Sequence, residues 1–459
     1  MFGALRERNF RLLFTGQTFS LIGSSITTIA LAFAVLEISH NSATDVGIVV
    51  AAGLVPLVAF LVIGGVWADR LPRQWVMLVS DVIRFACQAV MAWLLLTHRA
   101  TIVDLVVLQF VRGSAEAFFR PAQSGLMPHT VSAEHLQQAN ALRGLTESLG
   151  VTLGAALGGV LVAVIGSGWA IGIDSVTYLI SACFLWGLRG LVVPATHTLS
   201  GSLSAVESGL TAGLTDGSFG LPADAPGEVP VGSGDSFLAD LRDGWQEFRS
   251  RTWLWVVVCE AALFHLLIIA PLMVLGPLVA RHSLGGAAAW GAILAAHGVG
   301  QVLGGVSGLR LRPARPLLLC GWLTLLEVPL FAFFALGYGT TALVPAAALC
   351  GISAALVNVL WETTLQEQIP SEALSRVSAF DYMGSLAFFP LGMVIAGPIE
   401  RVIGVGGSFT VATVATVASA VLQISLPDIR RVRRRVDAPS AGRRPAEPVG
   451  DDAVLLRDS

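Results

Sequence analysis

The chain contains no lysine, and all 28 of its basic residues are arginine. A Walker A loop needs a lysine to reach the nucleotide phosphates, so a phosphate-binding loop of that type is excluded. Charged residues of either sign are also scarce: they make up 13% of the 459 residues, where a soluble protein has about 25%. Because 54% of the residues are hydrophobic, the composition indicates an integral membrane protein that does not itself hydrolyse ATP.

Cysteine is scarce as well. The five cysteines each lie within an apolar stretch and form no C-x-x-C pair, which predicts small buried side chains and neither disulfides nor a zinc site. The metalloprotease sequence H-E-x-x-H and the hydrolase sequence G-x-S-x-G are both missing. We therefore expect no metal, no cofactor and no enzymatic activity.

Long apolar runs occur throughout the chain. Because about 20 residues cross the hydrocarbon core of a bilayer, runs of this length predict membrane-spanning helices. The first run is longer than the core of a signal peptide, so we expect it to remain as a helix. We expect an all-α membrane protein whose twelve spans cover residues 10–36, 44–68, 75–97, 101–122, 137–165, 168–190, 254–280, 286–309, 315–337, 341–363, 375–400 and 404–426.

A charged turn follows the second predicted span, and a similar turn follows the eighth. Gly64–Arg73 and Gly304–Pro313 both begin with a glycine pair, have an arginine six residues after the first glycine, and lie about 240 residues apart. Duplicated halves are common in transporters. The repeat therefore predicts two six-helix halves, residues 1–193 and residues 253–427.

The segments that flank the second half have a different composition. Residues 194–236 are rich in Gly, Ser, Pro and Ala and cannot bury enough apolar surface to order themselves, which predicts a flexible cytoplasmic linker. Leucine and aromatic residues recur at helical spacing in residues 237–252, which predicts an amphipathic helix at the membrane interface. Residues 428–459 contain prolines and mixed charges and are predicted to form a disordered cytoplasmic tail.

The arginines are distributed unequally between the loops of the two sides. One side carries only Arg99, Arg281 and Arg401, whereas the other carries most of the rest, including five in residues 430–435. Cytoplasmic loops collect positive charge, so we expect both termini in the cytoplasm. The richness in Ala, Gly and Arg fits a high-GC bacterium, which makes the bacterial plasma membrane the expected location.

The turn after the second predicted span resembles a known signature. Gly65–Arg73 is similar to G-x-L-A-D-R-x-G-R, the loop 2–3 sequence of the major facilitator superfamily, with Pro72 in place of the second glycine. The resemblance implies two halves that rock about a central cavity, with the loop acid meeting the eleventh span near residues 371–376. Topology determination by the arginines alone is the alternative, but it leaves the acid unexplained. The residues implied as a conformational switch are Asp69, Arg70 and Arg73.

Two further stretches, Arg8–Leu13 and Ala117–Ala122, are similar to the branch that contains bacterial enterobactin exporters and macrolide efflux proteins. The fifth predicted span resembles the antiporter signature G-x-x-x-G-P-x-x-G-G, with Ala155 in place of the proline. Small residues at this spacing let helices approach closely, and a kink there is associated with export in the family. The corresponding glycines are Gly150, Gly154, Gly158 and Gly159.

The fourth predicted span carries ionisable residues, which cost about 2.5–3.5 kcal/mol each at membrane depth and are therefore functional candidates. Drug–proton antiporters have an arginine where this chain has Gln109, so that role does not transfer to Gln109. Arg112, Glu116 and Arg120 follow at i, i+4 and i+8, on one helical face. Either Glu116 exchanges protons, with Arg112 beside it, or it only neutralises the two arginines.

Glu147 in the fifth span and Glu260 in the seventh are further candidates for proton coupling, because a carboxyl group in apolar surroundings holds a proton more readily. The alternative for each is a hydrogen bond to a neighbouring helix. His265 and His297 are expected to be packed, neutral donors. Spans three, six and nine support the cavity from outside in the resembled family. Structural roles are therefore expected for Asp81, Arg84, Asp174 and Glu327.

Together these features predict a secondary active transporter that exports small amphipathic or hydrophobic molecules by alternating access and proton antiport. A drug, an antibiotic, a siderophore or another natural product would fit as substrate. An importer of the same fold and a membrane receptor that transports nothing are the alternatives, because fold alone does not determine direction or activity. The expected partners are a small-molecule substrate, protons and the lipid bilayer; nucleic acid is not expected, and the chain is expected to be monomeric.

The fourth and tenth spans supply a predicted gate between the halves. Aligning Pro128 with Pro370 across the repeat places Arg120 opposite Glu362, at the inner ends of these spans. A salt bridge between them would close the cytoplasmic mouth, unless each residue only caps its own helix or meets lipid headgroups. We expect Arg120→Glu and Glu362→Arg each to abolish efflux from cells and the double variant to restore it. A double variant without efflux would support the alternative.

Overall fold

The computed structural model describes residues 3–188, 245–246, 248–308, 310–369, 371–386 and 388–434. At some positions within the helices only the backbone is described, namely 61–70, 133, 137, 140, 141, 145, 148, 371–376, 379 and 382. The predicted linker, most of the predicted amphipathic helix and most of the predicted tail therefore lie outside the described residues. Of the predicted tail, residues 428–434 are described, and residues 428–431 are helical.

Six long helices form the N-terminal half. They are α1 (Arg8–Ile38), α2 (Ala43–Arg70), α3 (Arg73–Leu96), α4 (Ile102–Leu126), α5 (Leu136–Ile165) and α6 (Ser167–Trp186). The sequence defines some of their ends directly: Thr101 and Asp104 form a capping box at the start of α4, so the first amide groups of that helix have acceptors. Gly166 separates α5 from α6 with a φ of 86°, a conformation that favours glycine.

The C-terminal half has more interruptions. Its first span joins α9 (Thr252–Phe264), α10 (Ala270–Val279) and two π-helical turns, at His265–Ile269 and Ala280–Leu284. Its third span is broken by a 3₁₀ turn, Leu325–Glu327. The other helices are α11 (Ala287–Gly308), α12 (Pro316–Thr324), α13 (Val328–Ala335), α14 (Thr340–Gln368), α15 (Ser371–Leu386), α16 (Phe389–Ser425) and α17 (Pro427–Arg431).

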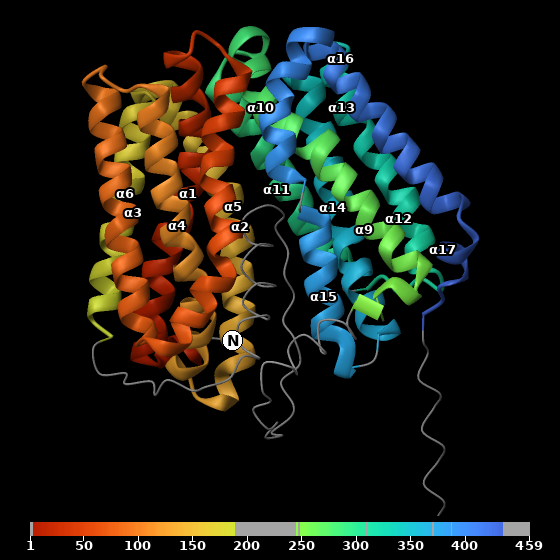
Figure 1. The fold of residues 1–459 in the computed structure, drawn as a ribbon, viewed down its shortest axis with the longest axis horizontal. Coiled ribbons are helices and arrows are strands. Elements are labelled where there is room, and N and C mark those ends of the chain that lie inside the picture. The colour runs from red at the N-terminus through yellow and green to blue at the C-terminus, as the bar shows by residue number, and fades with distance from the viewer. Residues whose placement is uncertain are drawn as a thin grey trace, which may run out of the picture.

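The membrane crossings in the described residues number twelve, as the apolar runs predict. Ten stretches are long and apolar enough to span a bilayer, and one of them, Met383–Ser425, has 43 residues and contains two crossings. It turns at Gly404, whose φ is 73°, so α16 consists of two helices (Figure 1). The remaining crossing is α4, which carries too many charges to appear apolar. The predicted all-α membrane fold is confirmed.

The two halves stand side by side, with the N-terminal half in red to yellow and the C-terminal half in green to blue (Figure 1). The chain's N-terminus lies at the lower end, and the turn within α16 lies at the upper end. We call the lower end the arginine-rich end, because it holds Arg73 at the α2–α3 turn and Arg310, Arg312 and Arg315 before α12. The other end is called the opposite end.

Each half is tied together at the arginine-rich end by a terminal segment. Glu7 accepts hydrogen bonds from the backbone N–H of Ser132 at 2.9 Å and from its hydroxyl at 2.8 Å, and these donors hold the pKa of Glu7 below its ordinary value. In the C-terminal half, the backbone N–H of Arg434 donates to the carbonyl of Ala314 at 3.2 Å, while its guanidinium pairs with Glu367 at 3.2 Å.

The halves meet mainly through α5 against α11 and α2 against α16. A Cβ atom added to Gly159 of α5 would lie 2.8 Å from the Cα of Gly291 in α11, so the two backbones touch. Gly397 of α16 approaches the backbone of Thr44 in α2 as closely. These glycines lie toward the opposite end of their helices, which shows that the halves are closed there by backbone packing.

We expect Gly159→Val to open this contact, because a side chain of that size has no space between α5 and α11. Overpacking of this kind costs about 1–3 kcal/mol, which thermal unfolding of the purified protein would register as a lower Tm. Gly305→Val is the matched control: it introduces the same β-branched residue into α11, where an added Cβ meets no atom within 4 Å. Equal melting temperatures for the two variants would contradict this account of the closed end.

Candidate functional site

A cavity of about 470 Å³ lies between the two halves, within the range of pockets that hold small molecules. The N-terminal half contributes residues of all its helices from α1 to α5, and the C-terminal half contributes residues of α9, α10, α11, α13, α14 and α16 and of the turns His265–Ile269 and Leu325–Glu327. The wall from the C-terminal half is mainly apolar, with Leu272, Trp290, Leu294, Leu330 and Phe389 among its residues. Such a chamber suits an apolar or amphipathic molecule.

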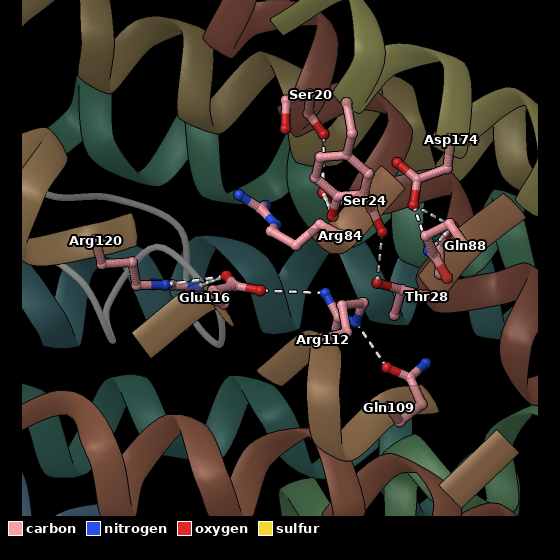
Figure 2. Close-up of polar contacts among 12 residues, drawn as sticks. Ser20, Ser24, Thr28, Arg84, Gln88, Gln109, Arg112, Glu116, Arg120 and Asp174 are labelled. Carbon is pink, nitrogen blue, oxygen red and sulfur yellow. Dashed lines mark hydrogen bonds and ion pairs between the residues drawn. The ribbon is translucent and has the colours of Figure 1, made fainter. Parts of the chain in front are cut away.

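The N-terminal wall, by contrast, carries the charged strip of α4. Glu116 accepts hydrogen bonds from Arg120 Nε at 3.0 Å and Nη2 at 2.6 Å, and it pairs with Arg112 Nη1 at 3.1 Å (Figure 2). Arg112 also donates from Nε to Gln109 at 2.6 Å. The structure thus brings together Arg112, Glu116 and Arg120 on one face that lines the cavity. One carboxylate is shared by two guanidinium groups.

Behind this strip lies a second set of buried polar groups. Arg84 of α3 pairs with Asp81 at 3.1 Å, and its guanidinium carbon lies 4.2 Å from the ring centroid of Tyr178 and 4.7 Å from that of Phe119. Asp174 of α6 accepts hydrogen bonds, 2.7 Å from Thr27 and 2.6 Å from Gln88. Figure 2 shows Arg84, Gln88 and Asp174 beside Ser24 of α1.

These contacts join α1, α3 and α6 through polar side chains, and the ring of Phe119 on α4 packs against the guanidinium of Arg84. Ser24 and Tyr178 share a hydrogen bond of 2.8 Å, which links the cavity wall to the layer behind it. Burying a charge is costly unless a partner neutralises it. The N-terminal half meets this condition for its arginines: Arg84 pairs with Asp81, Arg112 and Arg120 share Glu116, and Arg143 pairs with Glu147.

The other proton-coupling candidates lie in two different settings. Glu147 lines the cavity and pairs with Arg143 of its own helix at 2.7 Å. Glu260 is not among the residues that line the cavity. It accepts hydrogen bonds from Ser419 and, at 2.7 Å, from Gln423, which ties α9 to the second half of α16. The alternative weighed for Glu260, a hydrogen bond to a neighbouring helix, is the arrangement found.

The predicted gate is not formed in this structure as a pair across the halves. The guanidinium of Arg120 is engaged with Glu116, and Glu362 lies half-buried on α14. The two halves are closed at the opposite end, so a bridge at the arginine-rich end belongs to a different conformation. The Arg120–Glu362 gate remains a prediction.

The predicted switch is described only in part. The side chains of Asp69 and Arg70, and those of residues 371–376 that the acid was expected to meet, lie outside the described residues. Arg73, at the start of α3, donates from Nη1 to the carbonyl of Gly125, close to the end of α4. An added Cβ at Gly125 would meet this guanidinium, which would have to move aside.

The glycine series of the fifth span divides between two partners. Added Cβ atoms on Gly150, Gly154 and Gly158 would meet Leu21, Ser25 and Ile26 of α1, respectively. Gly159 instead faces Gly291 of α11, and the carbonyl of Ala155 also lies against Gly291. The series therefore packs α5 inside its own half and also forms the contact between the halves.

The expectation that spans three and nine stay outside the cavity is wrong for two residues. Arg84 and Glu327 both line the cavity, as does His297. The long side chain of Arg84 reaches past the rings of Phe119 and Tyr178, which the span order alone could not predict. The sequence did contain a sign that Glu327 is unusual. It is an acid within an apolar span and lies two residues before Pro329, and proline disturbs helical geometry.

Comparison with known sequences identifies the relatives of this fold. Residues 13–386 match the sequence profile described as Major Facilitator Superfamily. The chain is 22% identical over 437 residues to macrolide efflux protein A of Streptococcus pyogenes, covering 92% of this chain and 97% of that protein. It is 25% identical over 448 residues to the enterobactin exporter EntS of Salmonella choleraesuis, covering 94% and 96%. The predicted resemblance to this branch is confirmed.

Other matches are partial or concern the fold alone. The first three curated relatives are matched over only 42%, 36% and 40% of their own length; the second is the multidrug efflux pump Tap of Mycolicibacterium fortuitum. Among solved structures, the nucleoside transporter NupG superposes with a TM-score of 0.62 at 13% identity, covering 90% of this chain and 97% of that one. At this identity the similarity concerns only the helical architecture.

Removing the shared carboxylate of α4 tests the charge balance of the N-terminal wall. We expect Glu116→Gln to lower the stability by about 2–4 kcal/mol, because two arginines lose their partner in a largely buried setting. Glu147→Gln, which leaves a single arginine unpaired, is the matched control and should cost less. Thermal unfolding of both purified variants compares their losses of stability. A larger loss of stability for Glu147→Gln than for Glu116→Gln would contradict this assignment.

Proposed function

Because the chain belongs to the major facilitator superfamily and is a multi-pass membrane transporter, we propose that it exports small amphipathic or hydrophobic molecules by proton antiport. The observation that carries this proposal is the cavity between the halves, which has an apolar wall facing a wall with ion pairs. A cavity bounded by both halves changes its access when the halves rock, as alternating access requires.

The closed end and the loop charges support loading of the cavity from the cytoplasm. The halves pack backbone to backbone toward the opposite end, while the cavity extends to Arg120, Ser124 and Arg143 near the arginine-rich end. Cytoplasmic loops collect arginine, so we assign the arginine-rich end to the cytoplasm. In this state the cavity receives its substrate from the cytoplasmic side, which an exporter needs for loading.

The relatives support export as the direction. Macrolide efflux protein A and EntS, which align with nearly the whole chain, are named as an efflux protein and an exporter. Their substrates are properties of those proteins. For this chain, the apolar wall favours a substrate with a substantial hydrophobic part, because burial of apolar surface is the main source of binding energy there.

The first test is efflux of a panel of hydrophobic dyes and antibiotics from cells that express the protein. We expect efflux of at least one compound, and its loss when a protonophore collapses the proton gradient. Cells expressing Gly397→Leu at the same level provide the control, because Gly397 contacts the backbone of Thr44 and its replacement blocks closure. Uptake of the compounds would favour the importer, and efflux that survives the protonophore would contradict proton antiport.

A further inference from the structure

A second, smaller pocket lies at the arginine-rich end of the C-terminal half. The turn between α11 and α12, the end of α14 and Arg434 form its walls, and it shares no lining residue with the cavity between the halves. We call it the turn pocket. Its volume is about 160 Å³, whereas sites for drug-sized molecules have about 300–1,000 Å³. The turn pocket therefore suits one small group rather than a whole drug-sized molecule.

The segment that follows α16 builds one wall of the turn pocket. Ile429 of α17 is fully buried and packs in one apolar cluster with Leu317 of α12. Beyond it, the backbone N–H of Arg434 donates to the carbonyl of Ala314 at 3.2 Å. These contacts hold Arg434 beside the turn between α11 and α12. The pocket is therefore part of the folded C-terminal half.

Positive charge exceeds negative charge in the lining of the turn pocket. Arg312 and Arg434 line it, together with Glu367 of α14. Glu367 is engaged with Arg434, whose Nε lies 3.2 Å from the carboxylate. Among the described residues, no acid pairs with Arg312, which is exposed. The lining thus offers one guanidinium group that is available to an anion.

The sequence explains why this turn lacks a counter-charge of its own. The equivalent turn after α2 carries Asp69, but the corresponding position after α11 is Leu309. Arg310 and Arg315 on the same turn are exposed, and no acid pairs with them in the described part of the chain. The turn therefore presents positive charge that a bound anion can balance.

The remaining lining of the turn pocket is mainly apolar, and it lies where α14 reaches the end of its membrane span. Leu311 and Leu360 belong to this lining. Leu349, Leu356, Leu360 and Thr363 share one face of α14, and Thr363 also lines the pocket. Leu349 is 42% exposed, and an exposed leucine on a membrane-spanning helix meets lipid chains. One face of α14 thus runs from the lipid chains into the charged pocket.

We propose that the turn pocket binds the phosphate group of an anionic phospholipid. Arg312 supplies the counter-charge, and the first residue of α12, Pro316, lines the pocket at the positive end of that helix. The acyl chains lie along the exposed face of α14. A free phosphate would use only the charged part of this arrangement, which is why a lipid is the better match. The inference does not depend on the direction or the coupling of transport.

Lipid binding to the purified, delipidated full-length chain in detergent tests this site. Native mass spectrometry measures the affinities of dioleoyl phosphatidylglycerol, dioleoyl phosphatidylcholine and glycerol phosphate. We expect phosphatidylglycerol to bind most tightly. Phosphatidylcholine has the same acyl chains but carries a choline that offsets its phosphate charge. Glycerol phosphate has the charge but no chains, so it separates a soluble phosphate from a lipid.

Three variants separate the pocket from the general charge of the turn. We expect Arg312→Gln to bind phosphatidylglycerol at least about fivefold more weakly, the contribution of one arginine near an anionic headgroup. Arg312→Lys should keep most of the affinity. Arg315→Gln removes the same charge from the same turn, but Arg315 does not line the pocket, so the affinity should change much less. Because both arginines are exposed, all three variants should unfold at the temperature of the unmodified protein when no lipid is added.

Three results would overturn the inference. Equal affinities for phosphatidylglycerol and phosphatidylcholine would show that the phosphate charge is not recognised. Equal losses for Arg312→Gln and Arg315→Gln would show attraction to the whole basic turn rather than binding in the pocket. Glycerol phosphate binding as tightly as phosphatidylglycerol would assign the pocket to a soluble phosphate. The efflux experiment is decided independently of all three.

Discussion

Charge buried at membrane depth is the constraint on which this structure depends. An arginine or a carboxylate in a bilayer is tolerated when it faces protein or a cavity and when a partner neutralises it. The N-terminal half satisfies that condition with a network across α1, α3, α4 and α6, in which Glu116 serves two arginines and Asp174 is held by Thr27 and Gln88. The network gives this half a polar wall.

The C-terminal half is built differently, with an apolar wall and two buried acids that lack arginine partners. Glu260 accepts hydrogen bonds from Ser419 and Gln423 away from the cavity, whereas Glu327 lies on the cavity wall beside Ser353, and each acid keeps one buried oxygen without a hydrogen-bond partner. Two π-helical turns and a 3₁₀ turn interrupt its spans. Irregular backbone of this kind is found where a helix lines a site. The two halves therefore contribute different chemistry to one chamber.

Much of the site could be anticipated from residue spacing. The i, i+4, i+8 pattern placed Arg112, Glu116 and Arg120 on one face, and the structure joins them in one ion-pair strip. Spacing gives the contacts within a helix, because the rotation per residue is constant. Contacts between helices depend on how the spans pack, which explains why Arg84 and Glu327 were placed outside the cavity and why Glu260 could not be located.

The sequence by itself determined the membrane setting, the twelve crossings and the family, since each follows from hydrophobic length or from a contiguous motif. Only the tertiary structure decided which acids keep a counter-ion and which end of the molecule is closed. Those properties arise from contacts between residues far apart in the chain, such as Gly159 with Gly291 and Ser353 with Glu327.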